Sequence, residues 1–327
     1  MSRRLRIAGE LCFAVLLCCA APAVLGDTYP TKAIRYVVPY PPGGSTDILT
    51  RIVGQKLTES WGQQVVVDNR GGASGIIGAE LVAKSAPDGY TLLMTASGPH
   101  AINPSLYRKL PYDSLKDFAP VTLVAKLPML LLAHPSVPVD SAKDLLALLK
   151  SRRGSFVYAS IGNGTPSHLA MELLKSMAGV EVVHIPYKGS GPALVALVGG
   201  QEASVMFDSV LSSYPHVKSG KLKALAVSTE QRLPALPSLP TVAESALPGY
   251  EAYTWTATVA PAGVPPSTVQ KLSREIARIV QMPDVREKLE GQGAVPVGNT
   301  PEQFSAFAKA EIAKWGKVIR DANVHVD

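Results

Sequence analysis

The chain has 327 residues, with 32 Lys plus Arg against 26 Asp plus Glu and a formal net charge of +6. Hydrophobic residues make up 46% and charged residues 18%, which excludes an intrinsically disordered chain and allows either one large domain or two ordinary ones. The excess of basic residues is small and forms no repeated basic-aromatic motif, so the composition also argues against nucleic acid as a partner.

The first 26 residues have the pattern of a secretory signal peptide. Three arginines within the first six residues precede an apolar run over residues 11–20, and small residues follow that run. The run is too short to span a bilayer, so we expect an exported protein that acts outside the cytoplasm. Cleavage fits best after Gly26, with Ala23 as an alternative.

Sequence signatures of common enzymes do not occur in this chain. All three cysteines, Cys12, Cys18 and Cys19, lie in the first segment, so we expect the mature protein to have no disulfide, thiol nucleophile or cysteine-bound metal. The six histidines are scattered and form no HxH or HExxH pair of the kind that binds zinc. The chain also has no Walker A, GxGxxG or GxSxG motif. We therefore expect neither a metal nor another cofactor and no catalysis, with a secreted α/β enzyme as the alternative.

From residue 33 onward, short strand-like runs alternate with helix-like ones. The first series predicts strands at residues 34–39, 65–68 and 90–95 and helices at residues 47–57 and 76–84. The second series predicts helices at residues 141–150, 167–177 and 193–198 and strands at residues 156–159, 182–185, 204–207 and 224–228. This alternation is typical of mostly parallel sheets covered by helices, so we predict an α/β fold with two such sheets in two lobes.

Two extended apolar runs, residues 121–133 and 253–259, are interpreted as the crossings between the lobes. Lobe 1 then comprises residues 27–126 and 254–327, lobe 2 comprises residues 127–253, and a ligand cleft lies between them. In the returning C-terminal part we expect a helix after Pro266. Another helix should be capped by Thr300 in a capping box with Gln303.

A glycine-rich loop joins the first predicted strand to the first helix. Its sequence, PPGGSTD over residues 41–47, lets backbone N–H groups approach a ligand, and Ser45 or Thr46 can cap the helix. The positive end of the helix would then face an anion in the cleft. A purely structural strand-to-helix turn explains the same residues through capping alone.

A similar loop, residues 160–168, follows a strand of the second series. Thr165 is a suitable N-cap, Pro166 is a suitable first helical residue, and Gly162 and Gly164 leave the backbone open. Two helix N-termini could thus face each other. Each macrodipole contributes only about 0.3–1 kcal/mol, so charge-assisted hydrogen bonds of about 1.5–3 kcal/mol each must supply most of the affinity. A ligand with a carboxylate at each end fits this arrangement.

Polar residues also follow two other predicted strands. The loop at residues 95–100 either adds hydroxyl donors through Thr95 and Ser97 or forms an ordinary turn. Asp208 comes directly after the strand at residues 204–207, and its bare carboxylate would repel an anion. Its role is therefore either to cap the next helix or to orient waters or a ligand amine.

Several short motifs occur in order along essentially the whole chain. They include VVPYPPGGSTD at residues 37–47, PDGYTLL at 87–93, LPYD at 110–113, HIPYKG at 184–189 and PTVAE at 240–244. In this order and spacing they resemble the Bug family, the extracytoplasmic solute receptors of tripartite tricarboxylate transporters.

The resemblance implies a type II-like periplasmic binding protein fold whose two lobes close on one small carboxylated ligand. It implies that the loop at residues 43–47 meets the ligand, partly through ordered water, and that the loop at residues 160–168 grips its other end. Ile161 and Pro166 are expected to tune ligand choice. The expected ligand-binding residues are Gly43, Gly44, Ser45, Thr46, Asp47, Thr95, Ser97, Ser160, Gly162, Asn163, Gly164, Thr165, Ser167, His168 and Asp208.

We therefore predict a non-enzymatic receptor for a di- or tricarboxylate or a related organic acid. It is expected to act as a monomer that delivers its ligand to membrane permease subunits. A receptor that serves a sensor protein is the alternative.

Overall fold

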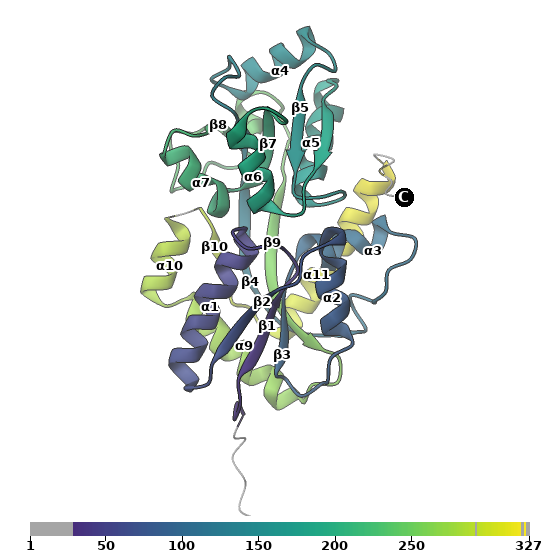
Figure 1. The fold of residues 1–327 in the computed structure, drawn as a ribbon, viewed down its shortest axis with the longest axis vertical. Helices are drawn as coiled ribbons and strands as arrows, with labels where there is room; N and C mark the ends of the chain where they lie inside the picture. The colour runs from purple at the N-terminus through teal and green to yellow at the C-terminus, as the bar shows by residue number, and fades with distance from the viewer. Residues whose placement is uncertain (1–28, 292, 322–323, 325–327) are drawn as a thin grey trace, which may run out of the picture. The chain divides into compact units, whose positions relative to one another are not determined.

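The computed structural model describes residues 29–291, 293–321 and 324 (Figure 1). The predicted signal peptide at residues 1–26, with the three cysteines, lies outside the described residues. All helices and strands considered below belong to one unit of the chain, Lys32–Asp327.

The first part of this unit forms three parallel strands in the order β2, β1, β3. They are β1 (Ile34–Val38), β2 (Val65–Asn69) and β3 (Thr91–Ala96). The helices α1 (Ser45–Trp61) and α2 (Ile76–Ala83) connect them. The apolar residues of β1 and β3 are almost completely buried beneath these helices. The sequences of both strands are therefore almost continuously hydrophobic, as is typical of a covered parallel sheet.

Two long antiparallel strands, β4 (Phe118–Ala133) and β9 (Tyr253–Pro261), continue this sheet. β9 pairs with β3, and β4 pairs with the other side of β9, so the sheet continues in the order β3, β9, β4. The last residues of β4 then pair with β7 and β8 instead. Figure 1 shows β4 and β9 running side by side from the lower to the upper half of the unit. The two segments that were interpreted as crossings are thus strands of the sheet itself.

The strands beyond β4 form the second half of the sheet. They are β5 (Val157–Ser160), β6 (Val183–Pro186), β7 (Val205–Ser209) and β8 (Lys223–Val227). The helices of this half are α4 (Ala142–Ser151), α5 (Pro166–Ala178), α6 (Ser190–Gly199), α7 (Val210–Lys218) and α8 (Val242–Ser245). β5 is parallel to β6 and β7, whereas β7 and β8 are antiparallel to β4.

The α/β fold is therefore confirmed, but the two halves of the sheet are mixed and not mostly parallel as predicted. The parallel pairs lie at the two outer ends of the sheet, and the antiparallel pairs involve β4 or β9. The reason is topological, because the chain passes between the halves along β4 and returns along β9, and these strands run against their neighbours.

The C-terminal part returns to the first half of the sheet. It comprises α9 (Pro266–Val280), α10 (Pro283–Glu290), β10 (Val295–Pro296) and α11 (Pro301–Asp321), with β10 pairing to β4. The predicted capping box at the start of α11 is confirmed, because the Thr300 N–H donates to Gln303 Oε1 (3.0 Å) and the Gln303 N–H donates to Thr300 Oγ1 (3.3 Å). A short helix, α3 (Asn103–Leu106), follows β3 and contacts α11.

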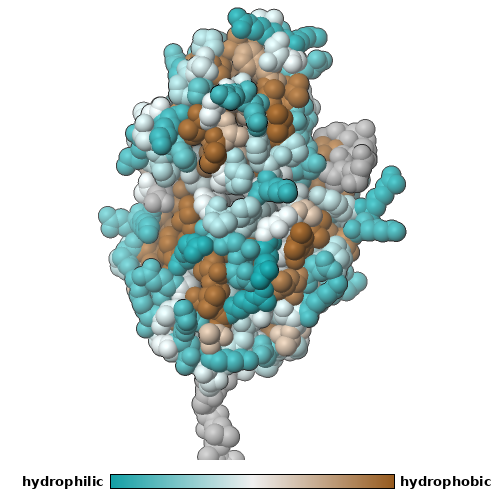
Figure 2. All heavy atoms as spheres, in the orientation of Figure 1, coloured by the Kyte–Doolittle hydropathy of each residue, from teal (hydrophilic) through white to brown (hydrophobic). Residues whose placement is uncertain are grey.

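Large apolar side chains fill the interior on both sides of the sheet, and hydrophobic residues on the face in Figure 2 form separate patches among hydrophilic ones. Such scattered exposure is usual, because roughly half of a folded protein's accessible surface is apolar. Within the described part of the chain, no helix combines the length and the apolar character that crossing a membrane requires.

A buried carboxylate fastens α11 to β9. Glu311 is only 5% exposed, and its Oε2 accepts hydrogen bonds from the indole N–H groups of Trp255 (2.8 Å) and Trp315 (3.0 Å). Replacing Glu311 by Ala would leave both buried donors unpaired, so we expect the free energy of unfolding to fall by about 2–4 kcal/mol in urea titrations. The exposed Lys309→Ala on the same helix is the control and should change it by less than about 0.5 kcal/mol. An equal loss of unfolding free energy in the two variants would contradict the stabilising role of the Glu311 hydrogen bonds.

Candidate functional site

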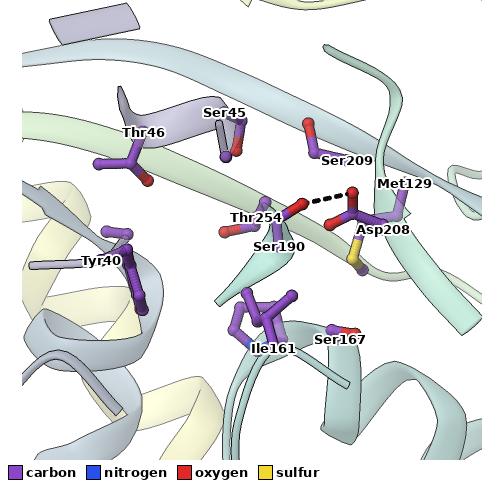
Figure 3. Close-up of a pocket in the computed structure, with 13 residues that line it drawn as sticks. Tyr40, Ser45, Thr46, Met129, Ile161, Ser167, Ser190, Asp208, Ser209 and Thr254 are labelled. Carbon is purple, nitrogen blue, oxygen red and sulfur yellow. Dashed lines mark hydrogen bonds between the residues drawn. The ribbon is translucent and has the colours of Figure 1, made fainter. Parts of the chain in front are cut away.

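A cavity lies at the point where the two halves of the sheet meet. The space that no atom fills measures about 480 Å³, including the part open to solvent. Figure 3 shows that side chains from both halves point into it. The lining residues are Tyr40, Gly44, Ser45, Thr46, Ala96, Met129, Ile161, Pro166, Ser167, Ser190, Asp208, Ser209 and Thr254. Among these described residues, none is Lys, Arg or His, and Asp208 is the one carboxylate.

The start of α1 forms one wall of the cavity. Gly44 is the N-cap residue, and no side chain caps the helix, so the prediction that Ser45 or Thr46 caps it is wrong. Asp47 instead reaches back, and its Oδ2 accepts a hydrogen bond from the Gly43 N–H (3.0 Å). This bond holds the glycine loop while leaving the Ser45 and Thr46 side chains at the cavity wall.

Asp47 is fixed from the side that faces away from the cavity. Its carboxylate forms an ion pair with Arg51 (3.0 Å) and accepts from Asn69 Nδ2 (3.0 Å). Burial acts to raise the pKa of Asp47, but hydrogen bonds from Arg51, Gly43 and Asn69 outweigh it and hold the pKa below its usual value. Asp47 is therefore ionised and engaged in supporting the loop.

Backbone donors at the start of α1 remain available to a ligand. The first backbone hydrogen bond of the helix runs from the Ile48 N–H to the Gly44 carbonyl (3.0 Å). The N–H groups of Ser45, Thr46 and Asp47 precede it, and such groups have no acceptor within their own helix. Together with the positive end of a 17-residue helix, they favour an anion at this end of the cavity.

The start of α5 forms the opposite wall, and it leaves fewer donors without a partner than the start of α1 does. Thr165 caps the helix as predicted, with its Oγ1 accepting from the His168 N–H (3.5 Å) and donating to the Gly162 carbonyl (2.7 Å). Pro166, the first helical residue, has no N–H to offer. The Ser167 hydroxyl donates to the Phe207 carbonyl. The two helix starts that face the cavity are therefore not equivalent.

Two stacked histidines support this second loop from behind. The ring centroids of His168 and His184 are 4.2 Å apart, and the two rings are nearly parallel. His168 Nδ1 accepts from the Gly164 N–H (2.9 Å), and His184 Nε2 lies 2.6 Å from Ser160 Oγ. Burial and the neighbouring His168 lower the pKa of His184 to about 3, and burial also lowers the pKa of His168. Both rings are therefore neutral at pH 7, and they position the loop without lining the cavity.

Asp208 lies at the end of β7 in the cavity wall and is only 2% exposed. Its Oδ2 accepts hydrogen bonds from Ser190 Oγ (2.7 Å) and Ser212 Oγ (2.7 Å), the first of which is drawn in Figure 3. Burial raises the pKa of Asp208 to about 6, and these hydrogen bonds limit the rise. The N-cap position of α7 belongs to Ser209, without a side-chain cap, so Asp208 is not the helix cap that one of the two sequence interpretations proposed.

The remaining polar groups near the cavity differ in their hydrogen bonding. Ser209 lines the cavity, and its Oγ is buried and has no hydrogen-bond partner among the described residues. Thr95 Oγ1 is also buried without a partner, but Thr95 does not line the cavity. Ser97 Oγ lies 2.7 Å from Thr254 Oγ1, so Ser97 positions a lining residue without lining the cavity itself.

A second hollow adjoins the cavity and shares Tyr40 and Ile161 with it. Gly162 and Asn163 line this hollow together with Ser74. The Ser74 hydroxyl donates to the Asn163 carbonyl (2.8 Å), which ties the segment after β2 to the loop after β5.

The predicted site residues thus fall into three groups. Gly44, Ser45, Thr46, Ser167 and Asp208 line the cavity, and Gly162 and Asn163 line the adjoining hollow. Gly43, Asp47, Thr95, Ser97, Ser160, Gly164, Thr165 and His168 line neither, and most of them hold the loops in place. The lining residues that were not predicted to contact the ligand are Tyr40, Ala96, Met129, Ser190, Ser209 and Thr254. Sequence signals lay close to three of them, because Tyr40 belongs to the VVPYPPGGSTD motif, Ala96 to the loop at residues 95–100, and Ser190 follows the HIPYKG motif.

Comparisons with known proteins point to one family. The family profile described as "Tripartite tricarboxylate transporter family receptor" matches residues 49–324. Protein BugT from Bordetella pertussis is 42% identical over 303 residues, which cover 92% of each chain.

Solved structures agree with this match. The structure "R. palustris Rpa4515 with adipate" is 39% identical, with a TM-score of 0.89 over 91% of this chain and 99% of the other. The structure of MatC from Rhodopseudomonas palustris with bound malate is 34% identical, with a TM-score of 0.84 over 89% of this chain and 100% of the other. The predicted periplasmic binding protein fold is confirmed by these similarities.

The raised pKa of Asp208 predicts a pH-dependent stability. The folded protein holds this proton up to about pH 6, whereas an unfolded Asp loses it near pH 4, so stability is lost as the pH rises between these values. We expect the free energy of unfolding of the ligand-free protein to fall by about 2.4 kcal/mol from pH 4 to pH 7.5 relative to Asp208→Asn. Parallel pH profiles of the two proteins in urea titrations would show that Asp208 titrates normally.

Proposed function

Because the chain belongs to the Bug family of tripartite tricarboxylate transporter receptors, we propose that it binds a small di- or tricarboxylate, or a related organic acid, in the cavity between α1 and α5. The observation that carries this proposal is the start of α1, where unpaired backbone N–H groups and two hydroxyl side chains meet a cavity without basic residues. Neutral donors of this kind stabilise a carboxylate through charge-assisted hydrogen bonds. The bound acids named in the two similar structures, adipate and malate, agree with this class of ligand.

The proposed contacts with the ligand come from both halves of the sheet. Gly44, Ser45 and Thr46 would hold one carboxylate, and Ser167, Asp208 and the hydroxyl groups of Ser190, Ser209 and Thr254 would surround the rest of the ligand. The predicted site residues that do not line the cavity, such as Gly43, Asp47 and His168, would act by positioning these groups. Water would fill the space that a small acid leaves.

Ligand binding would be coupled to closure of two lobes. We take residues 27–126 with 254–327 as one lobe and residues 127–253 as the other, as predicted from the sequence. A ligand that touches both lobes has a higher affinity for the closed state and thus favours it. The hydrogen bond from Ser74 to Asn163 would form part of the closed state, because it joins segments of the two lobes.

The receptor would act in the periplasm after removal of the signal peptide at residues 1–26. It would bind its ligand without chemical change, as a monomer, and deliver it to membrane subunits of a transporter.

A thermal-shift screen of the mature protein tests the ligand class. Mono-, di- and tricarboxylates, amino acids, neutral sugars and nucleotides are compared at equal concentration. At about 100 times its dissociation constant, a true ligand stabilises the protein by about 2.7 kcal/mol, which raises the melting temperature by several degrees. We expect at least one di- or tricarboxylate to do so. A shift with neutral sugars or nucleotides alone would refute the proposal.

Gly44→Ala tests whether the α1 wall contacts the ligand. Gly44 has an ordinary extended backbone, with φ of −85°, so alanine adds no backbone strain. Its Cβ would enter the cavity wall 3.2 Å from Ser190 Cβ and displace that side chain slightly. We expect ligand affinity to fall about tenfold or more in calorimetric titrations, with a change in melting temperature below about 2 °C. Gly199→Ala is the matched control, because its Cβ meets nothing within 4 Å and lies outside the cavity lining, and it should leave affinity unchanged. Unchanged affinity of Gly44→Ala would place the ligand elsewhere.

A further inference from the structure

The cavity has two chemically different ends. At the α1 end, backbone N–H groups and the Ser45 and Thr46 side chains offer hydrogen-bond donors. At the α5 end, the Ser167 hydroxyl proton is committed to the Phe207 carbonyl and Pro166 has no N–H, which leaves the backbone N–H of Ser167 without an acceptor in its own helix. Asp208 lines the same cavity with its buried carboxylate. The cavity therefore offers more donors at α1 than at α5, and it contains a carboxylate of its own.

The hydrogen bonds of Asp208 hold its carboxylate in place without neutralising its charge. Ser190 and Ser212 both donate to the same atom, Oδ2, and neither carries a charge. No salt bridge of Asp208 occurs among the described residues, and no Lys, Arg or His lines the cavity with it. A ligand group that donates a hydrogen bond would thus gain more from Asp208 than a carboxylate, which would be repelled by it.

We infer that the cavity selects carboxylic acids that carry a hydroxyl or ammonium group, and that Asp208 is the specificity-determining residue that accepts the hydrogen bond from this group. The inference rests on the proposed function, since it concerns the same cavity. It replaces the expectation of a carboxylate at each end with one carboxylate at α1 and a hydrogen-bond donor at Asp208. The buried Ser209 Oγ, which has no partner among the described residues, lies in the same wall and leaves a further polar contact open to the ligand.

Asp208 is the group near the cavity whose charge changes near neutral pH. Apart from Tyr40, the residues that line the cavity with it or bond to it are Gly44, Ser45, Thr46, Ala96, Met129, Ile161, Pro166, Ser167, Ser190, Ser209, Ser212 and Thr254. None of these titrates. Burial raises the pKa of Tyr40, the other titratable residue in the lining, so Tyr40 stays neutral. Asp47 and Arg51 form their ion pair behind α1, outside the lining.

Pairs of acids that differ only in one substituent test the inference. The probes are succinate with malate, glutarate with 2-hydroxyglutarate, and adipate with 2-hydroxyadipate, and aspartate supplies the ammonium group. Dissociation constants are measured by calorimetry at pH 6, 7 and 8, where the carboxyl groups of the probes stay largely ionised. For the pair whose chain length fits the cavity, we expect the substituted acid to bind at pH 8 at least about tenfold more tightly than its unsubstituted partner. The reason is that a hydrogen bond to a charged acceptor increases affinity by one to two powers of ten.

The pH dependence gives a second readout that a merely structural residue would not change. An unsubstituted acid should bind at least about tenfold more tightly at pH 6 than at pH 8, because it requires protonated Asp208, whose pKa burial raises to about 6. The substituted acid should change by less than about threefold. In Asp208→Asn, both the preference and the pH dependence should disappear, and the unsubstituted acid should bind more tightly at pH 8 than it does to the wild type.

Ser209→Ala is the matched control, because it alters the same wall without altering charge. It should weaken both members of a pair to a similar extent and keep the pH dependence. If acids bind to the wild type without a substituent preference, or if Asp208→Asn keeps that preference, the inference is wrong while the proposed function stands. If no carboxylic acid binds to the wild type at all, the proposed function fails and the inference fails with it.

Discussion

The antiparallel pair of β4 and β9 holds the candidate site together, because both halves of the sheet are built on it. Their register runs from Phe118 opposite Pro261 to Pro128 opposite Tyr253, and the next residue of β4, Met129, pairs with Ser209 of β7. The change of partner therefore occurs at the cavity, where Met129 and Thr254 line the wall. Any displacement of one half against the other must bend these two strands, and this would open or close the space between the starts of α1 and α5.

An anion in this cavity would have to be held without a cation. The first turn of α1 answers this requirement with backbone donors, and Asp47 makes them available by bonding back to Gly43 while its charge is balanced by Arg51. The arrangement keeps the charged pair out of the lining and leaves uncharged groups toward the ligand. Asp208 is the exception, because its carboxylate lies in the lining beside Ser190 and adds a negative charge that a pair of helix starts alone would not supply.

Local rules predicted the elements and several caps, whereas contacts between distant segments decided the rest. The caps at Thr165 and Thr300 were predictable, since each depends on residues within one helical turn. The cap of α1 was assigned wrongly, because the bond from Gly43 to Asp47 is supported by Asn69, on a strand that folds against the helix from 22 residues away. The lining residues Ser209 and Thr254 were missed, because each is an ordinary strand residue until β4, β7 and β9 meet. The mixed direction of the sheet could not be seen either, since a strand and an extended crossing have the same hydrophobic pattern.

A crystal structure of the mature protein with its tightest-binding acid tests most directly the central claim that uncharged donors at the start of α1 hold the ligand. The account predicts one carboxylate oxygen within about 2.7–3.2 Å of the backbone nitrogens of Ser45 and Thr46, with no Lys or Arg side chain in contact with that carboxylate. A carboxylate bound to a basic side chain, or an acid bound outside the cavity while the α1 donors bind only water, would contradict it.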